Sequence, residues 1–207
     1  MHLRMTGTVL YDPERATPYV RVRLTLDDGH SLSFCDPRRF GTGELALGRP
    51  ALDAFFQARL GLEPLGPHFT SDHLFTLTRN RRAPIKAFLL DQRRIAGVGN
   101  IYANEALFRA RIHPLRATGQ LKRSQVAALR DAVVGALSAG LDAGGASIDD
   151  FRHPDGVKGA FQNEFLVHSR EGEPCTVCGN PVRKFVAAGR GTYACEVCQK
   201  RPRVRRG

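Results

Sequence analysis

The chain has 207 residues, and its 31 lysines and arginines against 20 aspartates and glutamates give a net charge of +11 at pH 7. This length allows one or two domains and a small module. Residues 151–207 hold 11 basic against 5 acidic side chains, and a basic excess of this kind indicates a nucleic acid as partner. A membrane surface fits less well, because the sequence has no long basic amphipathic helix and no apolar run of spanning length. We see no targeting segment, so a reducing cytoplasm is expected.

The first 45 residues predict β-structure. Residues 2–10 and 19–26 have strand patterns, and the second segment alternates apolar and polar residues, which is typical of a half-buried strand. Asp27, Asp28 and Gly29 form a hairpin turn signal before a return strand. These few strands could not close a sandwich, and the first begins at residue 1, so we expect further sheet upstream.

The sequence Asp-Pro-Arg-Arg-Phe-Gly follows the return strand at residues 36–41. It has two interpretations of similar weight. Arg38 and Phe40 could form a loop tip that inserts into a duplex, with Arg39 on the backbone. The segment could also be a plain connector in which Phe40 packs inward.

From residue 50 the apolar pattern becomes helical. The pattern predicts helices at residues 50–60, from an N-cap at Ser71, and from Pro84 with Lys86 on the side opposite the core. A basic break at residues 79–82 separates the last two.

Gly97 and Gly99 form a turn that leads into a helix starting at Asn100. Such a turn presents unpaired N–H groups to an anion, although many helix pairs contain one for packing alone. A long amphipathic helix over residues 126–141, which ends at two glycines, predicts core, and residues 151–166 look loop-like.

Two C-x-x-C pairs, sixteen residues apart, predict a four-thiolate zinc ribbon. The cysteines are Cys175, Cys178, Cys195 and Cys198. Two disulfides in a secreted chain are the weaker alternative. Between the pairs, glycines flank Arg190 and would let it project from a hairpin tip to grip a phosphate, although a solvated turn arginine is as compatible with these residues.

Several motifs occur in a fixed order along the chain: HLRMTG at 2–7, DPRRFG at 36–41, LGLEPL at 60–65, IKAFLLDQ at 85–92, AGVGNIYANE at 96–105, GGAS at 144–147 and GRGT at 189–192 within the ribbon. Together they resemble the formamidopyrimidine-DNA glycosylase family, bacterial enzymes that excise oxidised purines from DNA. The resemblance extends from His2 to Gln199.

The resemblance implies an α+β fold and a division of the chain into four parts. These are the C-terminal part of a β-sandwich domain at 1–62, a helix–two-turn–helix domain at 63–150, a lesion-capping loop region at 151–166, and a β-hairpin zinc finger with a basic tail at 167–207. It also implies one structural Zn²⁺ and double-stranded DNA with oxidised bases or abasic sites as partner. We expect a monomer in the bacterial cytoplasm, associated with the nucleoid.

The same resemblance assigns site residues. Arg190 corresponds to the arginine that grips the phosphates around the damaged nucleotide and assists strand cleavage. Met5, Arg38 and Phe40 correspond to the side chains that fill the space of the extruded base, and this set favours the purine-lesion branch. Further DNA contacts are expected from Arg39, Arg81, Arg82, Lys86, Asn100 and Lys158.

The family's nucleophile is an N-terminal proline followed by a glutamate, but position 2 here is His. The proline amine attacks C1′ and displaces the base. We therefore expect a base-excision glycosylase and abasic-site (AP) lyase whose 207 residues lack the N-terminal catalytic segment and are inactive without it. The alternative is a catalytically inactive protein that binds damaged DNA or abasic sites.

Overall fold

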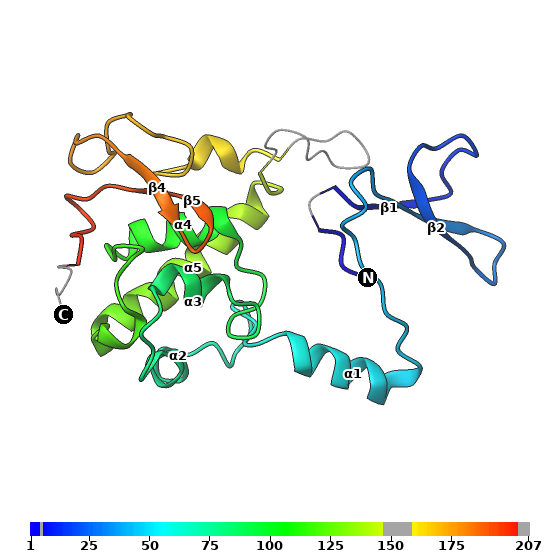
Figure 1. Ribbon diagram of the computed structural model, residues 1–207, viewed down its shortest axis with the longest axis horizontal. Coiled ribbons are helices and arrows are strands. Elements are labelled where there is room, and N and C mark those ends of the chain that lie inside the picture. The colour runs from blue at the N-terminus through cyan, green and yellow to red at the C-terminus, as the bar shows by residue number, and fades with distance from the viewer. Residues whose placement is uncertain (5, 147–158, 203–207) are drawn as a thin grey trace.

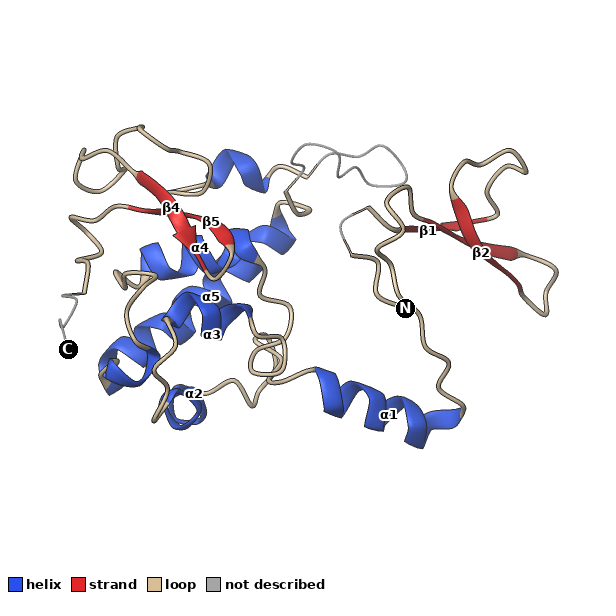
Figure 2. Ribbon diagram, in the orientation of Figure 1, coloured by secondary structure: helices blue, strands red, loops and turns tan. Residues whose placement is uncertain are grey.

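The computed structural model describes residues 1–4, 6–146 and 159–202 (Figure 1). Met5 and Lys158 therefore lie outside the described residues. The elements in chain order are β1 (Thr8–Tyr11), β2 (Val20–Thr25), β3 (Ser31–Cys35), α1 (Gly48–Arg59), α2 (Ser71–Thr78), α3 (Ile85–Leu90), α4 (Asn100–Arg109), the 3₁₀ helix η1 (Thr118–Gln120), α5 (Arg123–Asp142), the 3₁₀ helix η2 (Phe161–Glu164), β4 (Arg183–Ala187) and β5 (Arg190–Ala194). The predicted α+β class is confirmed, since Figure 2 shows a sheet, a helical lobe and a hairpin on that lobe.

The N-terminal sheet is antiparallel, in the order β1-β3-β2. The strand predicted over residues 2–10 is wrong in its first half, because Arg4 has a left-handed φ of 58° and the N–H of Gly7 donates to the carbonyl of Leu3 at 3.0 Å. These features form a turn, and β1 begins only at Thr8.

The second strand was predicted to be half-buried, but it is mostly exposed. Val22 is 42 % exposed and Leu24 45 %. Val22 pairs with Phe34, and Leu24 pairs with Leu32, so both side chains lie on one face of the sheet. On this face Val22 and Leu24 are therefore open to solvent at the edge of the sheet, whereas Phe34 on the central strand is buried.

Helix α1 joins the sheet to the helical lobe (Figure 1) and has no buried residue. The chain enters the lobe at Gly61, whose N–H donates to the carbonyl of Gln92 at 2.8 Å. A Cβ at Gly61 would lie 2.4 Å from the carbonyl oxygen of Arg94, so only glycine fits this approach.

The helical lobe has the main hydrophobic core, built from α2 to α5. The stripe predicted for the long helix is buried at Val126, Leu129 and Val133, whereas Leu141 is 67 % exposed and not part of the core. The cap of α2 is Thr70, whose hydroxyl accepts from the N–H of His73 at 3.2 Å, one residue before the predicted cap. Among the described helices, none is both long and apolar enough to cross a membrane.

Candidate metal centre and nucleic-acid interface

The four predicted cysteines gather at one point. Their Sγ atoms all lie within 4.8 Å of one another. The Sγ atoms of Cys175 and Cys198 are 3.9 Å apart, and those of Cys178 and Cys195 are 3.4 Å apart. A tetrahedral zinc with Zn–S bonds of about 2.3 Å requires sulfurs about 3.8 Å apart. The cysteines therefore fit the zinc site that the sequence predicted.

Neighbouring donors support the thiolates. The N–H of Val177 donates to Sγ of Cys175 at 3.5 Å, and the side-chain amide of Asn180 lies 3.6 Å from Sγ of Cys178. Hydrogen bonds of this kind stabilise negative charge on metal-bound sulfur.

Strands β4 and β5 form an antiparallel hairpin with a two-residue turn. Ala188 and Gly189 both have positive φ, at 53° and 67°, which is the conformation of a tight hairpin turn. Arg190 follows this turn directly and is exposed. Its location at a hairpin tip agrees with the sequence-based expectation.

Two side chains from the helical lobe reach the hairpin tip at Gly191. The Asn100 amide at the start of α4 donates to the Gly191 carbonyl at 3.1 Å. Lys86 Nζ in α3 donates to the same carbonyl at 3.1 Å and to the Thr192 hydroxyl at 2.7 Å. The structure thus brings the predicted residues Lys86, Asn100 and Arg190 into one cluster.

Lys86 differs from the exposed phosphate-binding lysine that we expected. The side chain does leave the helical core, but the hairpin covers it, and Lys86 is 0 % exposed. Burial first, and then the positive charge of Arg190, lower the pKa of Lys86 from 10.5 to about 8. Its direct contact with DNA stays a prediction.

Sequence reasoning missed Glu105, which joins α4 to the segment that leads into the zinc finger. Glu105 is 0 % exposed. Its Oε2 accepts from the backbone N–H of Leu166 at 3.0 Å, and its Oε1 accepts from those of Val167 at 3.0 Å and His168 at 2.9 Å. The only signal in the sequence was an acidic residue followed directly by the apolar residues Ala106 and Leu107.

Other contacts also join the helical lobe to the C-terminal part of the chain that holds the zinc finger. The Asn104 amide lies 2.8 Å from Nδ1 of His168, and burial, together with the nearby Lys86 charge, lowers the pKa of His168 to about 4. A neutral His168 ring can therefore accept this hydrogen bond. The Gln199 amide donates to the Ile112 carbonyl at 2.8 Å, and His113 stacks on Phe185 with ring centroids 5.5 Å apart.

The loop at residues 36–41 is organised by Asp36. Its carboxylate accepts from the N–H of Gly41 at 2.8 Å and from the hydroxyl of Thr6 at 2.7 Å, and these bonds, in that order, lower the pKa of Asp36. Phe40 is 58 % exposed, and Arg38 and Arg39 are exposed beside it. The interpretation as a connector with Phe40 packed inward is therefore wrong, and the loop tip is the arrangement observed.

Two further predicted DNA contacts are arginines near the start of α3. Arg81 and Arg82 are exposed in the loop before α3.

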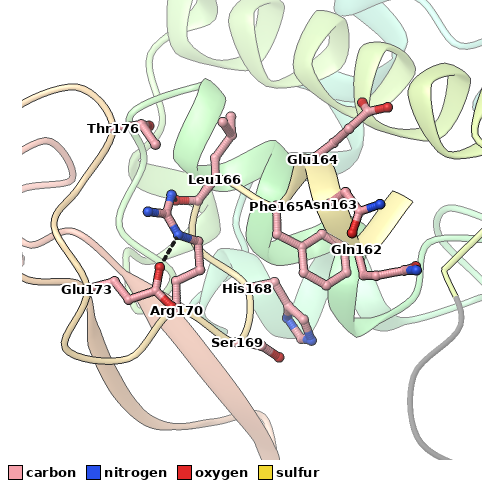
Figure 3. A pocket seen from close by; sticks show the side chains of 10 residues that line it. All are labelled: Gln162, Asn163, Glu164, Phe165, Leu166, His168, Ser169, Arg170, Glu173 and Thr176. Carbon is pink, nitrogen blue, oxygen red and sulfur yellow. Dashed lines mark hydrogen bonds and ion pairs between the residues drawn. The ribbon is translucent and has the colours of Figure 1, made fainter. Parts of the chain in front are cut away.

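A hollow of ≈ 670 Å³ beside η2, which the sequence did not predict, is lined by the residues in Figure 3. Arg170 on its wall is held by Glu173 at 2.8 Å and by the Leu166 carbonyl at 3.1 Å, so this arginine is engaged within the protein.

Three family models match the chain. They are described as the formamidopyrimidine-DNA glycosylase N-terminal domain at residues 1–43, the formamidopyrimidine-DNA glycosylase H2TH domain at 60–152, and the zinc finger found in FPG and IleRS at 172–201. The N-terminal match gives no support to the expectation of a missing N-terminal segment. The domain boundaries predicted from the sequence stay predictions.

Curated relatives are similar over nearly the whole chain. A formamidopyrimidine-DNA glycosylase of Roseiflexus is 47 % identical over 204 residues, which are 97 % of this chain and 73 % of the relative. One from Geobacter sulfurreducens is 44 % identical over 206 residues, 97 % of this chain and 74 % of the relative.

Solved structures agree. The MutM (Fpg) protein of Thermus thermophilus superposes with a TM-score of 0.83 at 42 % identity, covering 98 % of this chain and 75 % of the other. The Lactococcus lactis Fpg in complex with DNA containing an abasic site gives 0.85 at 34 % identity, covering 97 % and 74 %.

Proposed function

This chain belongs to the formamidopyrimidine-DNA glycosylase family, and from that premise we propose that it binds oxidised double-stranded DNA and acts in base excision repair. The proposed reaction is excision of oxidised purines, such as formamidopyrimidine and 8-oxoguanine, followed by cleavage at the abasic site. Lactococcus lactis relatives were crystallised with DNA containing Fapy-dG or an abasic site, which supports this substrate class.

The cluster at Gly191 is the observation that carries the proposal. An exposed arginine at a hairpin tip and an asparagine at a helix start belong to two different parts of the fold, and the Asn100–Gly191 hydrogen bond of 3.1 Å holds these parts together. An arginine fork and free helix N–H groups both suit phosphate oxygens. We propose that Arg190 and Asn100 bind the backbone around the damaged nucleotide.

The Asp36 loop supports the second half of the proposal. Flipping a base out of a duplex costs a few kcal/mol, and an inserted apolar side chain can offset part of that cost. Phe40 is 58 % exposed on a loop whose ends Asp36 fastens. We propose that Phe40 and Arg38 enter the space of the flipped base, with Arg39 on the backbone, and that Met5 and Lys158 take part as the resemblance implies.

Borohydride trapping on an 8-oxoguanine duplex tests the proposal. In this family the amine forms a bond to C1′ as the glycosidic bond breaks, and reduction of the resulting iminium leaves a covalent protein–DNA adduct. We expect tighter binding to the damaged duplex than to the matched undamaged one. Base release together with an adduct would show that an amine of this chain serves as the nucleophile although position 2 is His. Preferential binding without an adduct would support the binding-only alternative, and equal binding to both duplexes would refute both.

The phosphate-binding role of Arg190 needs its own variant. Arg190→Ala should weaken binding to the damaged duplex by about tenfold or more, because that is the change in affinity expected from the loss of one charge-assisted hydrogen bond. Arg183→Ala is the matched control, because Arg183 is an exposed arginine at the far end of the same hairpin. Zinc content should not change in either variant, and equal binding of Arg190→Ala and wild type would show that the assignment is wrong.

A further inference from the structure

Lys86 is a buried cation that has no acidic partner within residues 1–4, 6–146 and 159–202. Among the described residues no ion pair involves it, and its hydrogen-bond acceptors are the Gly191 carbonyl and the Thr192 hydroxyl. Burying a charge without a counter-charge is costly. A hydrophobic side chain would fill the same space at lower cost, so the bonds to the hairpin are the distinctive feature of this lysine.

These bonds lead directly to Arg190. Thr192 Oγ1 accepts from Lys86 Nζ at 2.7 Å and donates to the carbonyl of Arg190 at 3.0 Å. The Gly191 carbonyl, held by the same ammonium group and by Asn100, belongs to the next peptide unit. The two peptide units that follow the Arg190 Cα are therefore held by hydrogen bonds that lead to Lys86 in α3 and Asn100 in α4.

We propose that Lys86 is a positioning residue, which through Gly191 and Thr192 fixes the hairpin tip so that Arg190 is held ready for a DNA phosphate. This inference rests on the proposed function for the identity of the ligand. It differs from a direct Lys86–phosphate contact, because Lys86 is 0 % exposed and its bonds point into the hairpin. The lowered pKa of Lys86, caused in part by Arg190, agrees with two cations held close together.

A double-mutant cycle separates the two roles. Lys86→Met keeps an unbranched side chain, one heavy atom shorter, and removes the charge. We expect it to weaken binding to the damaged duplex by about tenfold in the wild-type background and by less than about twofold in the Arg190→Ala background, because a residue that acts through Arg190 has nothing left to position. Additive effects would overturn the proposal in favour of a direct contact.

The salt dependence gives a second readout. A lysine that touches a phosphate contributes about 0.9 to the slope of log K against log salt concentration. The double variant should therefore have the slope of Arg190→Ala alone, and a further fall of about 0.9 would contradict the positioning role. Lys200→Met controls for net charge, because it removes an exposed lysine from the basic C-terminal part of the chain.

Thr192→Val covers the case in which Lys86→Met fails to fold. It removes the hydroxyl between Lys86 and the Arg190 carbonyl while keeping a β-branched shape. Binding should again weaken only when Arg190 is present, and unchanged binding by a zinc-loaded Thr192→Val would count against the proposal.

A measurement without DNA keeps the inference separate from the proposed function. The amide protons of Arg190 and Gly191 should exchange faster in Lys86→Met than in wild type, since the tip has lost its support. Unchanged exchange would overturn the inference even if DNA binds. Faster exchange in a protein that does not bind damaged DNA would mean that only the proposed function has failed.

Discussion

The Glu105→Gln substitution replaces one oxygen of the contact between α4 and the segment that enters the zinc finger. The remaining oxygen can still accept from Val167 and His168, but the new NH₂ group would face the N–H of Leu166, which is itself a donor. The substitution therefore leaves the N–H of the partly buried Leu166 without its acceptor and makes two charge-assisted hydrogen bonds neutral.

The cost follows from these three bonds. An unsatisfied buried N–H costs about 1–3 kcal/mol, and a neutral bond in place of a charge-assisted one loses about 0.5–1.5 kcal/mol. With one bond of the first kind and two of the second, we expect the free energy of unfolding to fall by about 2–6 kcal/mol.

Urea unfolding followed by far-ultraviolet circular dichroism in the presence of zinc measures this change, and the chain has no tryptophan to follow by fluorescence. Glu164→Gln is the matched control, because Glu164 is exposed in η2 close to the same segment. That control should stay within about 0.5 kcal/mol of wild type. If Glu105→Gln also does, the three hydrogen bonds do not hold the two parts together.

Three further expectations follow from the metal centre, a buried histidine and a helical glycine. Cys178→Ser should remove the zinc and unfold the hairpin, because structural zinc contributes about 10–16 kcal/mol to such modules; the zinc-to-protein ratio from emission spectroscopy checks this, and a fully loaded variant would contradict it. The low pKa of His168 means that its contribution to stability is fully present above pH 6.5 and is lost as the pH falls towards about 4; nuclear magnetic resonance should show a neutral ring well below pH 6.5, and a ring that titrates at 6.5 would disprove its burial. Gly140→Ala should destabilise the protein by about 1–3 kcal/mol, since the added Cβ would lie 2.4 Å from the hydroxyl of Tyr102. Gly135→Ala in the same helix meets no atom within 4 Å and should not destabilise the protein. Thermal melts of the two variants measure the contrast, and equal melting temperatures would show that the Tyr102 side chain moves aside.

Local chemistry was sufficient where the signal lies in adjacent residues. Two cysteine pairs predicted the metal centre, and the glycines around Arg190 predicted the hairpin tip, because tight turns require special backbone angles that few residues tolerate. The turn that joins Leu3 to Gly7 escaped prediction, since Arg4 takes its left-handed φ of 58° within a stretch that has a strand pattern.

Contacts between distant parts of the chain could not be predicted from local patterns. The helical period placed Lys86 off the core, but the hairpin that covers it lies over a hundred residues later. The three N–H groups that Glu105 binds belong to a segment some sixty residues away. Periodicity reports which face of a helix is apolar, not which partner covers a polar one.

Helix α1 buries none of its residues and stands between the sheet and the helical lobe. Its 12 residues correspond to about 18 Å at the usual helical rise of about 1.5 Å per residue. The length of α1 therefore contributes to the separation between the sheet and the helical lobe. Adding or removing one helical turn would change the length of this connection by about 5.4 Å while leaving the hydrophobic core of the lobe whole, so under the proposed function α1 is the spacer between the DNA contacts of the sheet and those of the lobe.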